Sequence, residues 1–133
     1  MQHWVKGLAV AVALFCLVTV AACGATPTRP QLPGFIFPKS SDVVHKVALD
    51  ALVVNGFEIQ KTEPLYVEGY RARRVGIIIG SGGETAGVWL EPIDNSRTRV
   101  QVRTARTFLG GAGQRNWDRD IIEEMEKVLG KRE

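Results

Sequence analysis

Residues 88–102 read VWLEPIDNSRTRVQV, with apolar and polar side chains alternating on both sides of a turn cluster at residues 94–96. Val88 and Leu90 share one face before the turn, and Val100 and Val102 share one after it. Alternation with period two is typical of a strand that is buried on one face. The stretch therefore predicts two antiparallel strands in a sheet that is covered on one side only.

The same alternation occurs earlier in the chain. Phe57 and Ile59 alternate with polar residues, and a turn at Glu63-Pro64 follows them. A further alternating run, in which Leu65 and Val67 are the apolar members, continues to about residue 71. These runs predict two more strands before residue 88.

Apolar residues recur with a helical period on both sides of the strands. Ser40 or Ser41 suits the N-cap of a first helix, which Asn55-Gly56 ends. Asn116 suits the cap of a second helix, which Gly130 ends. The predicted stripes are Val44, Val47, Ala48, Ala51 and Leu52 in the first helix, and Trp117, Ile121, Met125, Val128 and Leu129 in the second.

Together these elements predict an α+β fold of two layers. A four-stranded antiparallel sheet carries an N-terminal and a C-terminal helix, in the order helix-strand-strand-strand-strand-helix, within one domain over residues 35–130. Residues 35–37 (FIF) are either an edge strand or an apolar segment packed under the domain. The predicted core consists of Leu52, Phe57, Ile59, Val67, Leu90, Val100, Val102, Ile121 and Met125.

A glycine-rich segment at residues 80–83 follows the apolar run 75–79. A phosphate-binding loop would end in Gly-Lys-Ser/Thr, but Glu84-Thr85 stands there and the acid would repel phosphate. We expect a flexible hairpin connection between the second and third strands. Alternatively, Ile77, Ile78 and Ile79 form an apolar lip that touches lipid or a partner.

The polar faces of the strands together make the outer face of the predicted sheet. Its members are Tyr66, Glu68, Tyr70, Trp89, Glu91, Arg99, Gln101 and Arg103. Tyr, Trp and Arg are favoured anchors of protein interfaces, although a solvated face with Glu–Arg pairs would have the same composition. The predicted partner-binding residues are Tyr66, Tyr70, Trp89 and Arg103, extended by Ile77 and Ile78.

The N-terminal residues 1–22 have the layout of a secretory signal peptide, with Lys6 before an apolar run at residues 8–22. The run is short of the ~20 residues that a transmembrane helix needs. Residues 20–23 (VAAC) resemble the lipobox of bacterial lipoproteins. The resemblance implies cleavage before Cys23 and acylation of that cysteine, which anchors the chain in a lipid bilayer. Ala25, rather than Asp, favours the periplasmic side of the outer membrane.

Residues 23–34 contain the lipidated Cys23 and the prolines at 27, 30 and 33. Their composition predicts a semi-rigid, polyproline-like tether. At ~3.1 Å per residue the tether would hold the domain about 34 Å from the lipid.

Charge and cysteine content exclude several classes of function. A net charge of +3 is no signature of nucleic-acid binding, and an exported protein does not meet RNA. Cys16 leaves with the signal and Cys23 is lipidated, so no disulfide is expected. His45 is then the single histidine of the mature chain, and we expect no metal site and no cofactor.

No catalytic set is recognisable, and the chain is not expected to be an enzyme. His45 and Asp42 are three residues apart on the first helix, but no nucleophile accompanies them. Arg71, Arg73 and Arg74 form a basic cluster that suits either membrane headgroups or an ordinary charged turn.

A wider resemblance rests on the order of these elements. A helix that ends at residues 55–57 (NGF), a hairpin at Glu91-Pro92, a return strand at residues 98–100 and a terminal helix look like many small bacterial lipoproteins of unknown function. They also loosely resemble the α+β domains of the outer-membrane assembly lipoprotein BamC. The resemblance implies a membrane-anchored periplasmic lipoprotein with a non-catalytic role, which binds an envelope protein or supports envelope assembly. The alternative is a small periplasmic ligand carrier or hydrolase.

Overall fold

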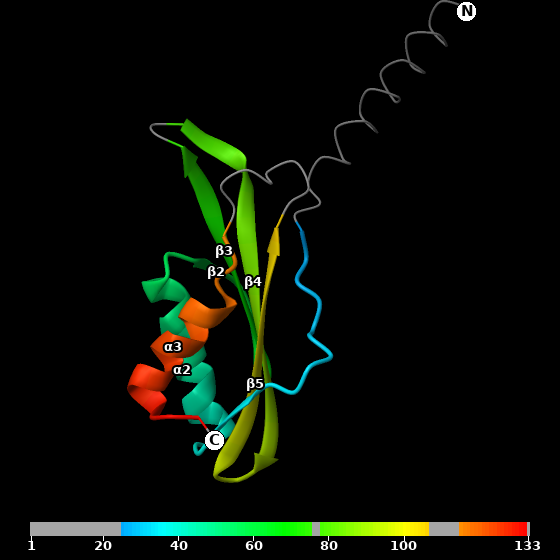
Figure 1. Cartoon of the computed structure of the whole chain (residues 1–133), viewed down its shortest axis with the longest axis vertical. Coiled ribbons are helices and arrows are strands. Elements are labelled where there is room, and N and C mark those ends of the chain that lie inside the picture. Colours follow the sequence, from blue (N-terminus) through cyan, green and yellow to red (C-terminus); the bar gives the residue numbers. More distant parts are fainter. Residues whose placement is uncertain (1–24, 76–77, 107–114, 133) are drawn as a thin grey trace, which may run out of the picture.

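Five strands form one antiparallel sheet, and two helices cover one of its faces (Figure 1). The computed structural model describes residues 25–75, 78–106 and 115–132. The elements in chain order are β1 (Phe35–Phe37), α2 (Ser41–Val54), β2 (Glu58–Glu63), β3 (Tyr66–Val75), β4 (Ile78–Asp94), β5 (Arg97–Arg106) and α3 (Asp118–Leu129). The spatial order of the strands is β1-β5-β4-β3-β2. The two-layer α+β prediction is confirmed.

The predicted number of four strands is wrong, because residues 35–37 pair with the sheet as β1. Phe35 lies opposite Val100 and Phe37 lies opposite Thr98, at the edge of β5. Phe37 is fully buried, whereas Phe35 is exposed. A strand of three residues is too short to show a period, so the sequence alone left this element open.

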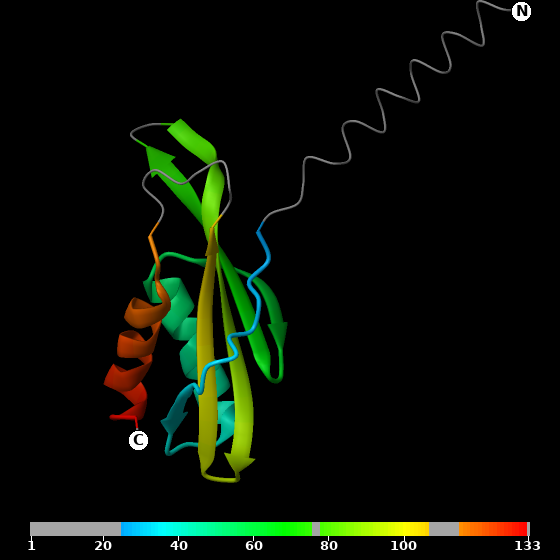
Figure 2. The same cartoon turned by 45° about the vertical axis from the view of Figure 1, so that its right-hand side comes forward.

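The glycine-rich segment also differs from its prediction as a loop. Ile78–Gly83 is the first part of β4, and Gly80 lies opposite Arg73 of β3. β2 pairs with β3 no further than Tyr70, and β5 pairs with β4 from Glu84 onward. Residues 71–75 and 78–83 therefore form a two-stranded arm that projects beyond both helices (Figures 1 and 2).

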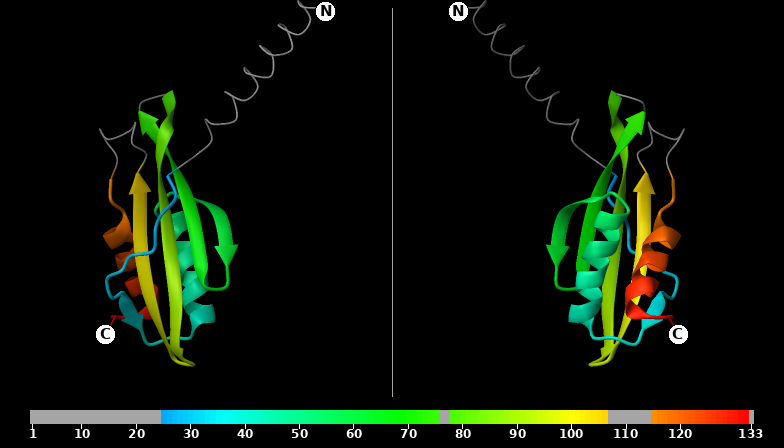
Figure 3. Two further views of the ribbon diagram at one scale, coloured as in Figure 1. Left: turned by 90° about the vertical axis from the view of Figure 1, so that its right-hand side faces the viewer. Right: turned by 90° about the vertical axis from the view of Figure 1, so that its left-hand side faces the viewer.

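The hydrophobic core lies between the inner face of the sheet and the two helices, which pack side by side (Figure 3). Eight of the nine predicted core residues are buried, and Ile59 is only partly buried. Leu65, expected on the same face as Val67, is 46% exposed because it lies in the β2–β3 turn. Gly56 ends α2 with a φ of 82°, as its position after Asn55 predicted.

The stripe of α3 is rotated from its prediction. Ile121, Met125 and Leu129 are buried, but Val128 is 65% exposed and Ile122 takes its place in the core. Both Val128 and Ile122 fit an apolar spacing of three and four residues, so the sequence pattern does not show which of them is buried. The packing of α3 against α2 and β5 determines that Ile122 is the buried residue.

Three polar contacts fix how the elements join. The Asp94 carboxylate accepts hydrogen bonds from the Ser96 backbone N–H and from Arg97, which lower its pKa to about 2 and close the β4–β5 turn. The buried Thr98 hydroxyl donates to the Lys39 carbonyl, between β1 and α2. The Thr104 N–H donates to Asp118 at the start of α3, at 2.6 Å. The Asp118 contact also occupies part of the free edge of β5.

We expect Ile122→Ala to lower the free energy of unfolding by about 2–5 kcal/mol, because it leaves a cavity at a buried site. Val128→Ala on the same helix is the matched control and should change the free energy by less than about 0.5 kcal/mol. Urea denaturation of both variants makes the comparison. Equal losses would show that α3 is rotated from the orientation described.

Candidate functional site

Two aromatic rings pack together on the outer face of the sheet, where alternation predicted them. Tyr66 and Trp89 are cross-strand partners on β3 and β4, with ring centroids 5.0 Å apart. A Cβ on Gly87 would lie 2.7 Å from the Trp89 ring and 3.0 Å from the Tyr66 hydroxyl. Gly87 therefore gives both rings room to pack on the backbone, and each is half-buried.

Tyr70 uses a second glycine in the same way. A Cβ on Gly83 would lie 2.7 Å from the Tyr70 hydroxyl oxygen, so this ring lies across β4 on the arm side of Gly87. The Tyr66 hydroxyl donates to Glu68 at 2.5 Å. Burial raises the pKa of the Tyr66 phenol, and its bond to the Glu68 carboxylate raises it further. The phenol therefore stays neutral and keeps its donor role at physiological pH.

The prediction that residues 23–34 form an extended spacer is wrong for residues 25–34, because these residues contact the sheet. Residues 25–34, which we call the N-terminal strap, lie along the outer face at β5 (Figure 2). The Gln101 amide donates to the carbonyls of Pro30 and Leu32, at 3.0 and 2.7 Å. Arg29 donates to the Gln101 side-chain oxygen at 2.6 Å. Gln101, expected on an open face, is consequently only 8% exposed.

The strap also neutralises charge on this face. Glu91 accepts from Arg29 at 2.9 Å and from its cross-strand partner Arg99 at 2.8 Å. The predicted Glu–Arg pairing is therefore present at this part of the face, beside the aromatic rings. These ion pairs are substantially exposed, so they fix geometry more than they add stability. The surface that remains open is made of Tyr66, Glu68, Tyr70 and Trp89.

Arg103 lies opposite Gly87 on β5 and lines a groove between the strap, β5 and α3. The groove has a volume of about 480 Å³, and Leu32, Phe35, Val102 and Ile122 give it an apolar lining. The Arg103 side chain is exposed beside it. Arg103 therefore neighbours the aromatic rings through Gly87 and also borders this groove.

Sequence reasoning missed a cluster on the inner face at the base of the arm. The guanidinium groups of Arg71 and Arg115 each lie 4.5 Å from the centre of the Trp117 ring, which also packs on Phe57. The carboxylate of Glu84 is 4% exposed and accepts from the Arg115 backbone N–H. Counting back from Leu90 in steps of two residues places Glu84 on this inner face, so the sequence could have revealed its position. The contacts with residues 71 and 115–117 depend on the fold, because these residues are distant from Glu84 in the chain.

His45 contacts β2 rather than Asp42 within the described part of the chain. Its Nε2 lies 3.2 Å from the Thr62 hydroxyl, and no contact joins it to Asp42 among the contacts of the described residues. Within the described ranges, no three His, Cys, Asp or Glu side chains are grouped as metal ligands would be. Over the same ranges, no helix has both the length and the apolar character needed to cross a membrane.

Two of the predicted sites lie wholly or partly beyond this description. Cys23 and Ile77 fall outside the described residues, while Ile78 is the first residue of β4 in the arm. A comparison of the chain with protein-family models finds no match, and a comparison with curated proteins finds none either. The resemblance to small lipoproteins and to BamC therefore stays a prediction.

We expect Gly87→Ala to destabilise the domain by about 1–3 kcal/mol, because the added methyl group displaces the Trp89 and Tyr66 rings. Trp89→Ala removes most of the clash. In a double-mutant cycle, Gly87→Ala should therefore cost much less when Trp89 is already alanine. Additive losses would mean that the rings do not lie on Gly87.

Proposed function

We propose that the protein is a lipid-anchored lipoprotein of the bacterial envelope, which faces the periplasm from the outer membrane. The observation that carries the proposal is the sequence of residues 20–23 (VAAC) at the end of an apolar signal. Acyl chains on Cys23 give stable anchoring, because each buried methylene contributes ~0.8 kcal/mol and more than one chain is present. The folded domain follows Cys23 almost at once.

The role of the domain is binding to an envelope protein rather than catalysis. The support is the outer face, where three half-buried aromatic side chains lie on backbone glycines. Rings that are packed in this way lose little conformational entropy when a partner covers them. Aromatic side chains of this kind are also frequent anchors at interface centres. The docking surface is formed by Tyr66, Glu68, Tyr70 and Trp89, with Arg103 opposite Gly87.

A second candidate is a carrier of a small ligand, and the groove beside Arg103 favours it. Its volume of about 480 Å³ lies within the range of small-molecule sites, and its lining combines apolar residues with arginines. Such a ligand would carry an acidic group for Arg103. Native mass spectrometry of the purified protein separates the candidates, since a retained small molecule that Arg103→Ala loses would support the carrier.

Metabolic labelling with a clickable fatty acid tests the anchor. We expect the parent protein to incorporate the label and Cys23→Ala to lose it, because the acceptor sulfur is gone. Cys16→Ala is the matched control and should label like the parent, since this cysteine leaves with the signal. Equal labelling of the Cys23→Ala variant would exclude lipidation at this site. Membrane fractionation then reports the inner or outer location.

Site-specific photocrosslinking in cells tests the docking surface. A crosslinking amino acid at Tyr70 should capture an envelope protein, whereas the same group at Asp50, exposed on α2, should not. Trp89→Ala should reduce capture at position 70, and Lys46→Ala, at an exposed residue of α2, should leave it unchanged. Circular dichroism confirms that each variant is folded. Capture that is equal from both positions would argue against this face.

A further inference from the structure

The groove between the strap, β5 and α3 gathers apolar side chains that are exposed to solvent. Leu32, in the strap, is 71% exposed, and Phe35, in β1, is 39% exposed. Val102 and Ile122, which belong to the core, also line the groove. Large apolar side chains that remain exposed around one concave site indicate a place for an apolar ligand.

One arginine of the groove is available to an acidic group. Arg119 is paired with Glu123 at 2.6 Å, and Arg132 is paired with Glu126 at 3.0 Å. Arg103 is exposed and forms no ion pair with any acid in the described ranges. Its guanidinium group can therefore offer two parallel N–H donors to a carboxylate.

The other polar side chains of the described lining, Asp118 and Gln101, are already bonded. Asp118 Oδ1 accepts from the Thr104 N–H at 2.6 Å and from the Thr104 hydroxyl at 2.7 Å. Asp118 also lies in the first turn of α3, where the helix dipole offsets its negative charge. Gln101 donates to the strap and accepts from Arg29. The lining therefore suits an apolar chain with a single negative charge.

β5 adds a backbone donor to the groove. In an antiparallel strand, the N–H and C=O groups of every second residue point to the same edge. A Cβ on Gly34 would lie 2.1 Å from the Val100 carbonyl oxygen, so this oxygen points to the outer edge of β5. The Thr104 N–H reaches Asp118 at that edge. Val102 lies midway and points its N–H into the groove, because β1 pairs with β5 no further than Val100.

We propose that this groove binds a fatty acid. The Arg103 guanidinium and the Val102 N–H hold the carboxylate, while Leu32, Phe35 and Ile122 contact the alkyl chain. A volume of about 480 Å³ is of the size that small-molecule sites have. The inference rests on the second candidate function, the ligand carrier, and names its ligand. It depends neither on lipidation of Cys23 nor on the aromatic docking surface.

NMR spectroscopy of the full protein in phosphatidylcholine nanodiscs tests the ligand class. Isotope-labelled methyl groups of Ile122 and Leu32 report on the groove, and those of Leu65, in the β2–β3 turn, report on a distant exposed site. The probes are octanoate, octanol and octylammonium, which share a chain and differ in head-group charge. Empty nanodiscs correct for probe that enters the lipid. Octanoate should shift the groove resonances to saturation, and octanol should bind about tenfold more weakly.

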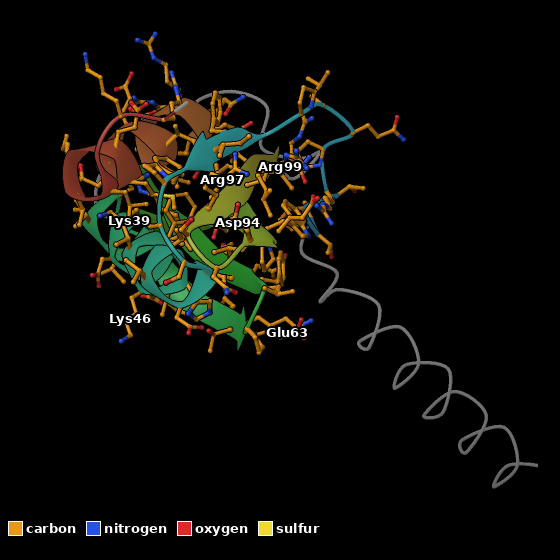
Figure 4. All side chains as sticks on the ribbon, turned by 90° about the horizontal axis from the view of Figure 1, so that it is seen from below. Lys39, Lys46, Glu63, Asp94, Arg97 and Arg99 are labelled. Atoms are coloured by element: carbon orange, nitrogen blue, oxygen red, sulfur yellow. The ribbon has the colours of Figure 1, made fainter. Side chains whose placement is uncertain are left out.

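Two variants separate the head group from the chain. Arg103→Ala should weaken octanoate binding about tenfold and leave octanol unchanged, because only the bond to the carboxylate is lost. Leu32→Ala, read from the Ile122 methyl group, should weaken both probes by the same factor, since it removes contacts with the chain. Lys46→Ala and Leu65→Ala are the matched controls. Figure 4 shows Lys46 on the side of α2 away from the strap, so neither control should change binding.

The outcomes distinguish the ligand from the carrier function. Octanol or octylammonium that binds as tightly as octanoate would overturn the proposed fatty acid and leave the carrier function standing. Octanoate binding that survives Arg103→Ala would do the same. Groove resonances that no probe shifts, or that shift without saturation, would also overturn the proposal. The native mass spectrum of the purified protein then decides separately whether the groove carries a different molecule.

Discussion

The structure depends on burying a single face of the long central strand β4. β4 runs for 17 residues, and along Ala86, Val88 and Leu90 its inward side chains are covered by the two helices. All of this burial lies on one side, so α2 and α3 must lie together on the inner face. Their own stripes meet the sheet and each other, and one contiguous core results. Without a disulfide in the described chain, this apolar burial is the main stabilising term.

Among the described residues, no helix covers the outer face of the sheet, and side chains and the strap cover it instead. Aromatic rings lie on Gly87 and Gly83, and the strap lies across β5 through Gln101. The aromatic rings and the strap both remove backbone and apolar surface from water without adding a helix. They also leave an exposed aromatic surface of defined shape, which is the property that a docking site needs.

Extension of the arm beyond the body follows from the same topology. Within the described residues, β2 pairs with β3 no further than Tyr70, β5 pairs with β4 no further than Glu84, and both helices end below the arm (Figure 1). Over these positions no strand of the described chain pairs with the outer edges of the arm, and soluble proteins usually protect such edges with charged residues. Here Arg73 and Arg74 stand in that position.

The sequence by itself determined the class of fold, the two helices, four of the strands and the outer position of Tyr66 and Trp89. Those features repeat with period two or near four along a short window, so neighbouring residues are enough to reveal them. Tertiary structure alone decided that residues 35–37 join the sheet, that Ile122 rather than Val128 enters the core, and that the strap docks. Each of these features depends on contacts between residues far apart in the chain, such as Gln101 and Leu32. Local periodicity cannot predict such contacts, because it reflects only neighbouring residues.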